Sequence, residues 1–217
     1  MKIKHKLHEI ANNIYALEID NDFDRAMLFM RVSEYYESKK YKGKHINIWD
    51  FIREYADGGD FKYPTDWEGF NLPISVAKEC MEFVIKDNTL SNYTPYDSFM
   101  YDILYELPED GYLIGTKSMK GSLFQHELCH ALYFTNNDYK RDADDMTNKI
   151  NKRVYNNLQK ELLSLSYHKS VTNDEIQAYF TTESSPIIAD FMPTIDSIEH
   201  HRQYKKKLSK YFKQLRC

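Results

Sequence analysis

Five consecutive residues, His126-Glu127-Leu128-Cys129-His130, have the types and the spacing needed for metal-dependent hydrolysis. On a helix, two histidines four positions apart share one face, so both imidazoles can bind one zinc ion. The glutamate beside them can take a proton from a water molecule on that metal. The pattern therefore predicts His126 and His130 as zinc ligands and Glu127 as the general base. The alternative is an ordinary buried helix in which the same side chains are only hydrogen-bonded or ion-paired.

The motif lies in a segment, residues 119–135, that has the pattern of a helix with one apolar side. At 100° per residue, Leu128 and Leu132 fall opposite the two histidines. Packing of the apolar side would orient the ligands before a metal binds. Cys129 lies beside the metal face, where a cysteine serves either as a soft ligand or, more commonly, as a small apolar filler.

A catalytic zinc ion usually takes three protein ligands and leaves its fourth position to water, so another ligand must come from elsewhere in the chain. The metzincin pattern is excluded, because Tyr133 and Asn136 stand where it requires glycine and histidine. A glutamate on a later helix is the next option. Glu175, 45 residues after His130, is the candidate.

Around Glu175 the sequence resembles the gluzincins, zinc peptidases whose third ligand is a glutamate near the start of a helix antiparallel to the motif helix. A small residue often follows that glutamate three positions later, as Ala178 does here. The resemblance covers residues 111–183 and implies a zincin-like core, a zinc cofactor and a peptide or protein substrate. It also implies that the strand expected at residues 111–116 is an edge strand that pairs with the substrate backbone. A tyrosine or histidine that stabilises the oxyanion is expected too, with five unranked candidates: Tyr133, Tyr139, Tyr155, Tyr167 and His168.

Two alternatives for the third ligand stay open. Thr172 and Glu175 have the spacing of a capping box, in which the glutamate side chain would bond the backbone N–H of Thr172 and would not bind metal. The ligand would then come from another histidine or acidic residue: His168, His200, His201, Asp142, Asp144 or Asp145. Peptide deformylases also carry the motif, but their third ligand is an upstream cysteine in a Gly-Cys-Leu context, whereas Cys80 stands between Glu79 and Met81 in a predicted helix.

The chain of 217 residues, 42% of them hydrophobic, is long enough for one large domain or for a domain with an accessory lobe. Residues 91–95 are the expected boundary between an N-terminal helical lobe, 1–92, and a metal-binding region, 93–217. The sequence has no apolar run of membrane-spanning length and begins with polar residues, so we expect an intracellular, cytoplasmic protein without a transmembrane segment. Three scattered cysteines, at 80, 129 and 217, agree with a reducing compartment.

The remaining pattern predicts a mainly helical α+β fold with a small sheet ahead of the motif helix. Strands are expected at residues 13–19 and 111–116. Helices are expected at residues 20–38, 49–55, 74–86, 142–166 and 174–182. Residues 63–73, which contain two prolines and several aromatic side chains, are expected to form a loop.

Residues 202–216 contain seven basic side chains and no acidic one, so the rest of the chain carries a net charge of −11 against −4 for the whole. Apolar residues at helical spacing predict an amphipathic helix here. They are Tyr204, Leu208, Tyr211, Phe212 and Leu215. The helix could dock against the acidic remainder of the chain, or it could bind a nucleic acid or another anionic surface.

These observations predict an intracellular zinc-dependent hydrolase, a metallopeptidase with zinc held by His126, His130 and Glu175 and with Glu127 as the base. Zinc would lower the pKa of its bound water from about 15.7 toward about 7. One alternative is a non-catalytic binding protein that works through its basic helix, although an intact Glu127 argues against it. The other is a hydrolase of a non-peptide amide.

Overall fold

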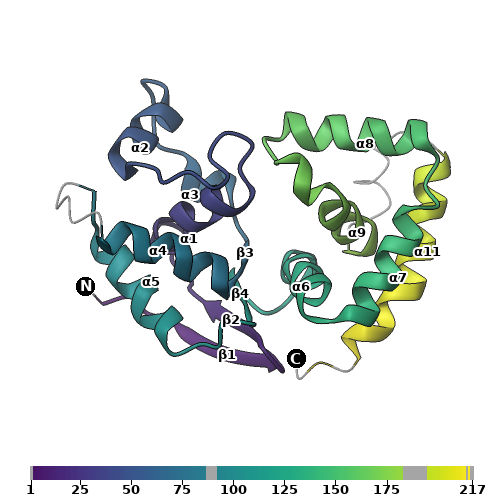
Figure 1. Ribbon diagram of the computed structural model, residues 1–217, viewed down its shortest axis with the longest axis horizontal. Helices are drawn as coiled ribbons and strands as arrows, with labels where there is room; N and C mark the ends of the chain where they lie inside the picture. Colours follow the sequence, from purple (N-terminus) through teal and green to yellow (C-terminus); the bar gives the residue numbers. More distant parts are fainter. Residues whose placement is uncertain (1, 87–91, 183–194, 214, 216–217) are drawn as a thin grey trace. The chain divides into compact units, whose positions relative to one another are not determined.

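The computed structural model describes residues 2–86, 92–182, 195–213 and 215. The described chain is α+β and mainly helical, as expected, with a four-stranded mixed sheet that precedes the motif helix (Figure 1). Contacts divide the protein into a first unit, Met1–Met119, and a second unit, Lys120–Cys217. The sequence placed the division near residue 92, ahead of a helix and a strand that the contacts assign to the first unit. Part of the expected boundary segment, including Ser91, lies outside the described residues.

The sheet of the first unit has the strand order β1-β2-β4-β3. Its strands are β1 (Lys6–Ala11), β2 (Ile14–Glu18), β3 (Phe70–Pro73) and β4 (Tyr112–Thr116). β1 and β2 form a hairpin that turns at Asn13, whose φ of 62° lies in the left-handed region. β4 runs parallel to β2 and antiparallel to β3. The expectation of an edge strand at residues 111–116 was wrong, because the backbone of β4 is paired on both sides.

Five helices accompany the sheet in the described part of the first unit. They are α1 (Asp22–Glu37), α2 (Ile48–Ala56), α3 (Tyr63–Asp66), α4 (Ile74–Lys86) and α5 (Pro95–Tyr105). Asparagine side chains cap two of them, Asn21 before α1 and Asn47 before α2. The expected loop at residues 63–73 was wrong in part, because α3 and β3 lie within it.

Helix α1 packs directly on the sheet, and a glycine permits the contact. The ring of Phe29 stacks on the ring of Phe70 with centroids 5.3 Å apart. A Cβ atom on Gly115 of β4 would lie 2.5 Å from Cε2 of Phe29, closer than van der Waals contact allows. Gly115 is therefore required by close packing.

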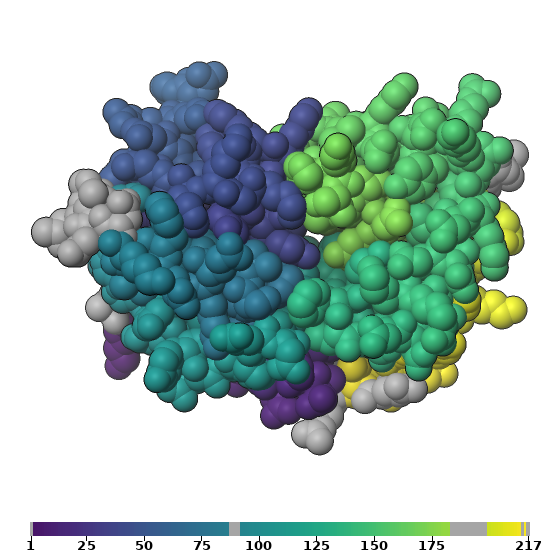
Figure 2. All heavy atoms as spheres, in the orientation of Figure 1, coloured from purple at the N-terminus to yellow at the C-terminus, as the bar shows by residue number. Residues whose placement is uncertain are grey.

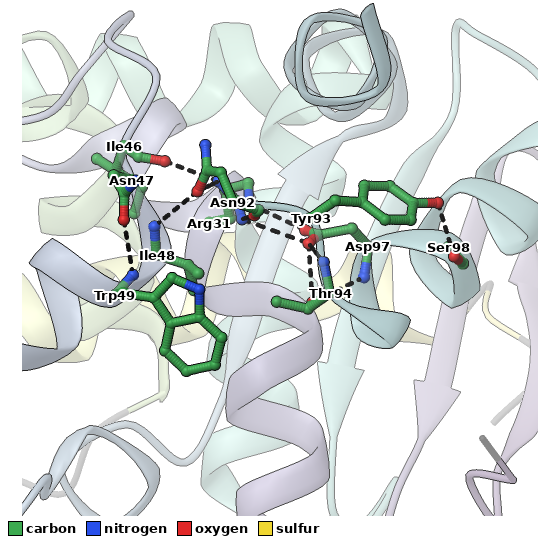
Figure 3. Close-up of polar contacts among 10 residues, drawn as sticks. All are labelled: Arg31, Ile46, Asn47, Ile48, Trp49, Asn92, Tyr93, Thr94, Asp97 and Ser98. Atoms are coloured by element: carbon green, nitrogen blue, oxygen red, sulfur yellow. Dashed lines mark hydrogen bonds and ion pairs between the residues drawn. The ribbon is translucent and has the colours of Figure 1, made fainter. Parts of the chain in front are cut away.

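A buried arginine holds three segments of the first unit together (Figure 3). The guanidinium of Arg31 donates to the carbonyls of Ile46 and Asn92, each at 2.7 Å, and to the carboxylate of Asp97 at 2.9 Å. Asp97 also accepts from the backbone N–H of Thr94 and thereby completes a capping box at the start of α5. Arg31 and Asp97 are both buried, so the pair carries its charges out of water.

The described part of the second unit is helical. It contains α6 (Ser122–Thr135), α7 (Asn137–Thr147), α8 (Lys152–Ser164), the short 3₁₀ helix η1 (Lys169–Val171), α9 (Thr172–Thr182) and α11 (Ile195–Phe212). The single helix expected at residues 142–166 was wrong. α7 ends at Thr147, and the side chain of Asn151 caps α8 by accepting from the backbone N–H of Arg153.

Helix α11 packs against α7 and α9 of its own unit. Its residues Tyr204 and Leu208 are fully buried, and the hydroxyl of Tyr204 lies 2.7 Å from that of Thr147. The ring of His201 donates from Nδ1 to the carbonyl of Phe180 at the end of α9, at 2.8 Å. The expected packing face of the basic helix is therefore present. Arg216, at the end of the basic run, lies outside the described residues.

The charges of α11 are partly compensated by one aspartate of α7. Lys207 and Lys210 each form an ion pair with Asp142, and the hydroxyl of Tyr211 donates to the same carboxylate at 2.8 Å. Burial alone would raise the pKa of Asp142, but the hydrogen bonds from Lys210, Tyr211 and Lys207 outweigh it and lower that pKa to about 2. In Figure 2 the yellow spheres of α11 reach the margin of this unit, so part of the helix is exposed to solvent.

Across the described residues, no helix combines the length and the apolar character that crossing a membrane requires. Cys80 and Cys129 are buried free thiols, and Cys217 lies outside the described residues.

Candidate metal centre

Three buried side chains of the second unit, His126, His130 and Glu175, form a group that could hold a metal ion. One ligand atom from each lies within 4.8 Å of the others. Nε2 of His126 is 3.8 Å from Oε2 of Glu175, and Nε2 of His130 is 3.7 Å from Oε1. Ligand atoms on a tetrahedral zinc ion, with bonds of about 2.0–2.2 Å, lie about 3.4 Å apart. Small side-chain movements would therefore bring the group to coordination distances.

Two helices supply the group, and their apolar residues fix where its members point. Helix α6 carries both histidines and buries Phe124, Leu128 and Leu132. Helix α9 carries Glu175 in its first turn, and it packs against α6 and against α11. The apolar side of the motif helix is buried as predicted, and the side that carries His126, Glu127 and His130 is buried as well.

Each imidazole uses its other nitrogen for a hydrogen bond. Nδ1 of His130 donates to Oδ1 of Asp174 at 2.8 Å. Nδ1 of His126 faces the hydroxyl of Thr182 at 3.4 Å, and that hydroxyl donates to the carbonyl of Ala178. A donor at Nδ1 places the lone pair of a neutral imidazole on Nε2, which is the atom that faces Glu175 in both rings.

The carboxylate of Glu175 does not close a capping box. The Thr172 hydroxyl donates to the carbonyl of Lys169, and Thr172 is itself the first residue of α9. Oε2 of Glu175 is buried and has no hydrogen-bond partner among the described residues. A buried oxygen without a donor costs about 1–3 kcal/mol, and more when it is charged. A metal cation between the two imidazoles would satisfy this atom, so the residues fit a bound metal.

The surroundings of the group favour positive charge. Burial acts to lower the pKa of His130, but the nearby carboxylates of Asp174, Glu175 and Glu127 outweigh it and hold that pKa well above its usual range. Glu127 itself is buried one position after His126. A proton or a metal cation can supply the charge that this cluster of carboxylates stabilises.

The other proposed third ligands have different partners. His168 lies 2.9 Å from the hydroxyl of Ser170, and His201 donates to Phe180. Asp142 pairs with lysines, and Asp144 accepts from Tyr133. The group that could hold a metal ion among the described residues includes none of the alternatives: His168, His200, His201, Asp142, Asp144, Asp145, Cys80 and Cys129. Burial raises the pKa of the Cys80 thiol to about 12 and that of Cys129 further.

Three tyrosines considered for oxyanion stabilisation are hydrogen-bonded to other side chains. Tyr133 donates to Asp144, Tyr139 to Gln177 and Tyr155 to Asn173. The oxyanion role of the five candidates, Tyr167 and His168 included, stays a prediction.

Sequence reasoning overlooked two residues beside the metal group. Tyr179 packs edge-on against His126, with ring centroids 4.7 Å apart, and its position four residues after Glu175 is the signal that could have identified it. Asp174 was also not assigned to the metal site, although it directly precedes the predicted ligand.

Comparisons of the chain with models of known families, with curated proteins and with solved structures found no match. The gluzincin resemblance accordingly rests on the motif and on the geometry of three side chains.

Proposed function

We propose that the protein is a zinc-dependent hydrolase, and specifically a peptidase, with His126, His130 and Glu175 as the metal ligands. The observation that carries the proposal is the buried carboxylate of Glu175, which faces Nε2 of both histidines and has an oxygen without a donor. Two imidazoles and one carboxylate are the ligand set of one class of catalytic zinc sites, in which the fourth position is left to water.

A zinc ion in this set would supply Lewis acidity, which polarises a substrate carbonyl and makes water acidic enough to react near neutral pH. The chain's own residues would do the remaining work. Glu127 accepts the proton of the attacking water and returns it to the leaving amine. Asp174 and Thr182 hold the two imidazoles in orientation through their Nδ1 atoms.

A peptide substrate follows from the gluzincin resemblance, and a non-peptide amide would need the same water activation. The position of β4 inside its sheet removes the strand that we expected to pair with a substrate backbone. Recognition of a peptide would therefore depend on other contacts.

The metal is tested first, by elemental analysis of protein purified without a histidine tag. We expect about one zinc ion per chain, and we expect most of it to be lost in His126→Ala and in His130→Ala, because each change removes a ligand. Stoichiometric zinc in both variants would refute the ligand assignment.

The chemistry is tested with Glu127→Gln, since the amide keeps the shape of the side chain but cannot accept the proton. The variant should retain zinc and lose about 10²–10⁴-fold in hydrolytic rate against a panel of peptides, unfolded proteins and simple amides. Glu161→Gln, on the exposed face of α8, is the matched control and should keep the wild-type rate. Equal rates for Glu127→Gln and wild type would exclude Glu127 as the base. Cleavage of the simple amides alone would replace the peptidase assignment with an amidase.

A further inference from the structure

A row of hydrogen bonds leads from helix α7 to the metal group. The hydroxyl of Tyr139 donates to Oε1 of Gln177 at 2.6 Å, and Nε2 of Gln177 donates to Oδ1 of Asp174 at 2.9 Å. The same Oδ1 accepts from Nδ1 of His130 at 2.8 Å. Tyr139 and Gln177 are both 0% exposed, so water does not compete for the bond between them, whereas Asp174 is partly exposed at 13%.

Donation runs from Tyr139 through Gln177 to Asp174, and His130 donates to Asp174 from the other side. A carboxylate can only accept, so Asp174 requires donors from both Gln177 and His130. The two ends of the Gln177 amide are not equivalent, and the Tyr139 hydroxyl donates to its oxygen end. The NH₂ end is thereby turned to Asp174. With Asp174 held in place, Nδ1 of His130 is the donor and Nε2 carries the lone pair that a metal needs.

We propose that Tyr139 and Gln177 are positioning residues that raise the metal affinity of the site by fixing Asp174 and, through it, the imidazole of His130. The proposal rests on the metal site of the proposed function. It assigns Tyr139 a role different from the oxyanion contact considered from sequence, because its buried hydroxyl donates to Gln177.

Two substitutions break the row at different points. Gln177→Met keeps the length of the side chain but removes both the donor to Asp174 and the acceptor of the Tyr139 hydroxyl. Tyr139→Phe keeps the ring and removes only the hydroxyl, so the Gln177 amide loses the contact that distinguishes its two ends. Without that contact the amide can turn by about 180° and present its oxygen to the carboxylate, where no hydrogen bond forms.

A matched control lies one residue before Asp174. The hydroxyl of Tyr155 donates to Oδ1 of Asn173 at 2.8 Å, also linking a neighbouring helix to the first turn of α9. Tyr155→Phe therefore removes a hydrogen bond of the same kind that does not lead to His130.

The experiment measures zinc affinity by titration against a competing chelator, with the full chain and its three variants. We expect a loss of about 10-fold in affinity for Gln177→Met, the lower end of the range for removing the direct partner of a metal-binding histidine, because Gln177 acts through Asp174, which the variant keeps. Tyr139→Phe should lose up to about 10-fold, equivalent to one hydrogen bond. Tyr155→Phe should match wild type.

A spectroscopic readout separates positioning from general destabilisation. The visible absorption spectrum of the Co²⁺-loaded protein reports the geometry of the ligands, and it should change in Gln177→Met and Tyr139→Phe but not in Tyr155→Phe. If Gln177→Met does not fold, Tyr139→Phe decides, since it keeps the packing of the ring.

Wild-type zinc affinity and an unchanged cobalt spectrum in Gln177→Met and Tyr139→Phe would overturn the positioning role while the metal site stood. A lower melting temperature with unchanged metal affinity would overturn it as well, because the row would then be only structural. Failure of the wild-type protein to bind zinc would instead refute the proposed function, and the positioning role with it.

Discussion

Replacing Glu175 with alanine should abolish most of the stabilisation that zinc gives to the protein. The substitution removes the carboxylate that faces both Nε2 atoms and leaves His126 and His130 on α6 as the remaining pair. Most of α9 should persist, because helices in proteins are held mainly by packing and the alanine side chain favours helix.

The size of the effect follows from the number of ligands. The free energy of zinc binding to structural sites with four protein ligands is about 10–16 kcal/mol, so one ligand contributes about 3 kcal/mol. Its loss lowers affinity about 150-fold. At a free zinc concentration about 100 times the wild-type Kd, the metal stabilises the wild-type fold by about 2.7 kcal/mol and the variant by only about 0.3 kcal/mol. For a chain of this length the melting temperature should rise by about 5–10 °C in wild type and by about 1 °C or less in Glu175→Ala.

The assay is a pair of melting curves, with and without zinc, for wild type, Glu175→Ala and Thr172→Ala. Thr172 is the control, because its hydroxyl donates to Lys169 and its loss should lower stability without changing the zinc-dependent shift. An undiminished shift in Glu175→Ala would refute the ligand assignment. If Glu175→Ala and Thr172→Ala also lost equal stability without zinc, Glu175 would be assigned to a capping box with Thr172 and not to the metal site.

Three further predictions concern the stability of the described fold, measured by urea unfolding. Arg31→Met should lower the free energy of unfolding by about 3–5 kcal/mol, because it leaves the carboxylate of Asp97 buried without its cation. The control Arg53→Met, in an exposed pair, should lower it by less than about 1 kcal/mol. Similar losses in the two variants would contradict this account. Gly115→Ala should cost about 1–3 kcal/mol because Phe29 has to move, and unchanged stability would show that α1 is loosely packed. Asp142 has a pKa of about 2 in the fold against an ordinary value of 3.8, so its contribution is complete above about pH 4 and disappears as the pH falls toward 2. Since its lysine partners are partly exposed, that contribution should be about 1 kcal/mol. Asp142→Asn should therefore be less stable than wild type at pH 6 but not at pH 2, and an equal difference at both pH values would contradict the prediction.

The sequence was most informative where a pattern is local. Helix α4 has the bounds expected for it, because apolar residues at helical spacing follow directly after Pro73. The motif helix and the helix of Glu175 were found for the same reason. The break between α7 and α8 was missed, because the asparagines at its ends, Asn148 and Asn151, are weak signals compared with proline or glycine.

Properties that depend on distant residues could not be predicted. The inside position of β4 depends on its pairing with β3 and β2, segments that lie about 40 and 95 residues earlier, and no feature of residues 112–116 specifies it. The bonds from Asp174 to His130 and from Thr182 to His126 depend on how α9 lies against α6. The spacing of the motif and the gluzincin resemblance identified the three side chains that could hold a metal ion, but not the residues that orient them.

The separation of the ligands along the chain also matters during protein synthesis. Glu175 lies 45 residues after His130, so a ribosome that adds about 5–20 residues per second exposes the two histidines about 2–9 s before the glutamate. During that interval the nascent chain has two imidazoles and no α9 to complete the site, so a metal ion bound to them should exchange readily. The site can close only when α9 has been made and has packed on α6. A nascent chain stalled before residue 172 should therefore lose zinc to a chelator that the completed chain resists.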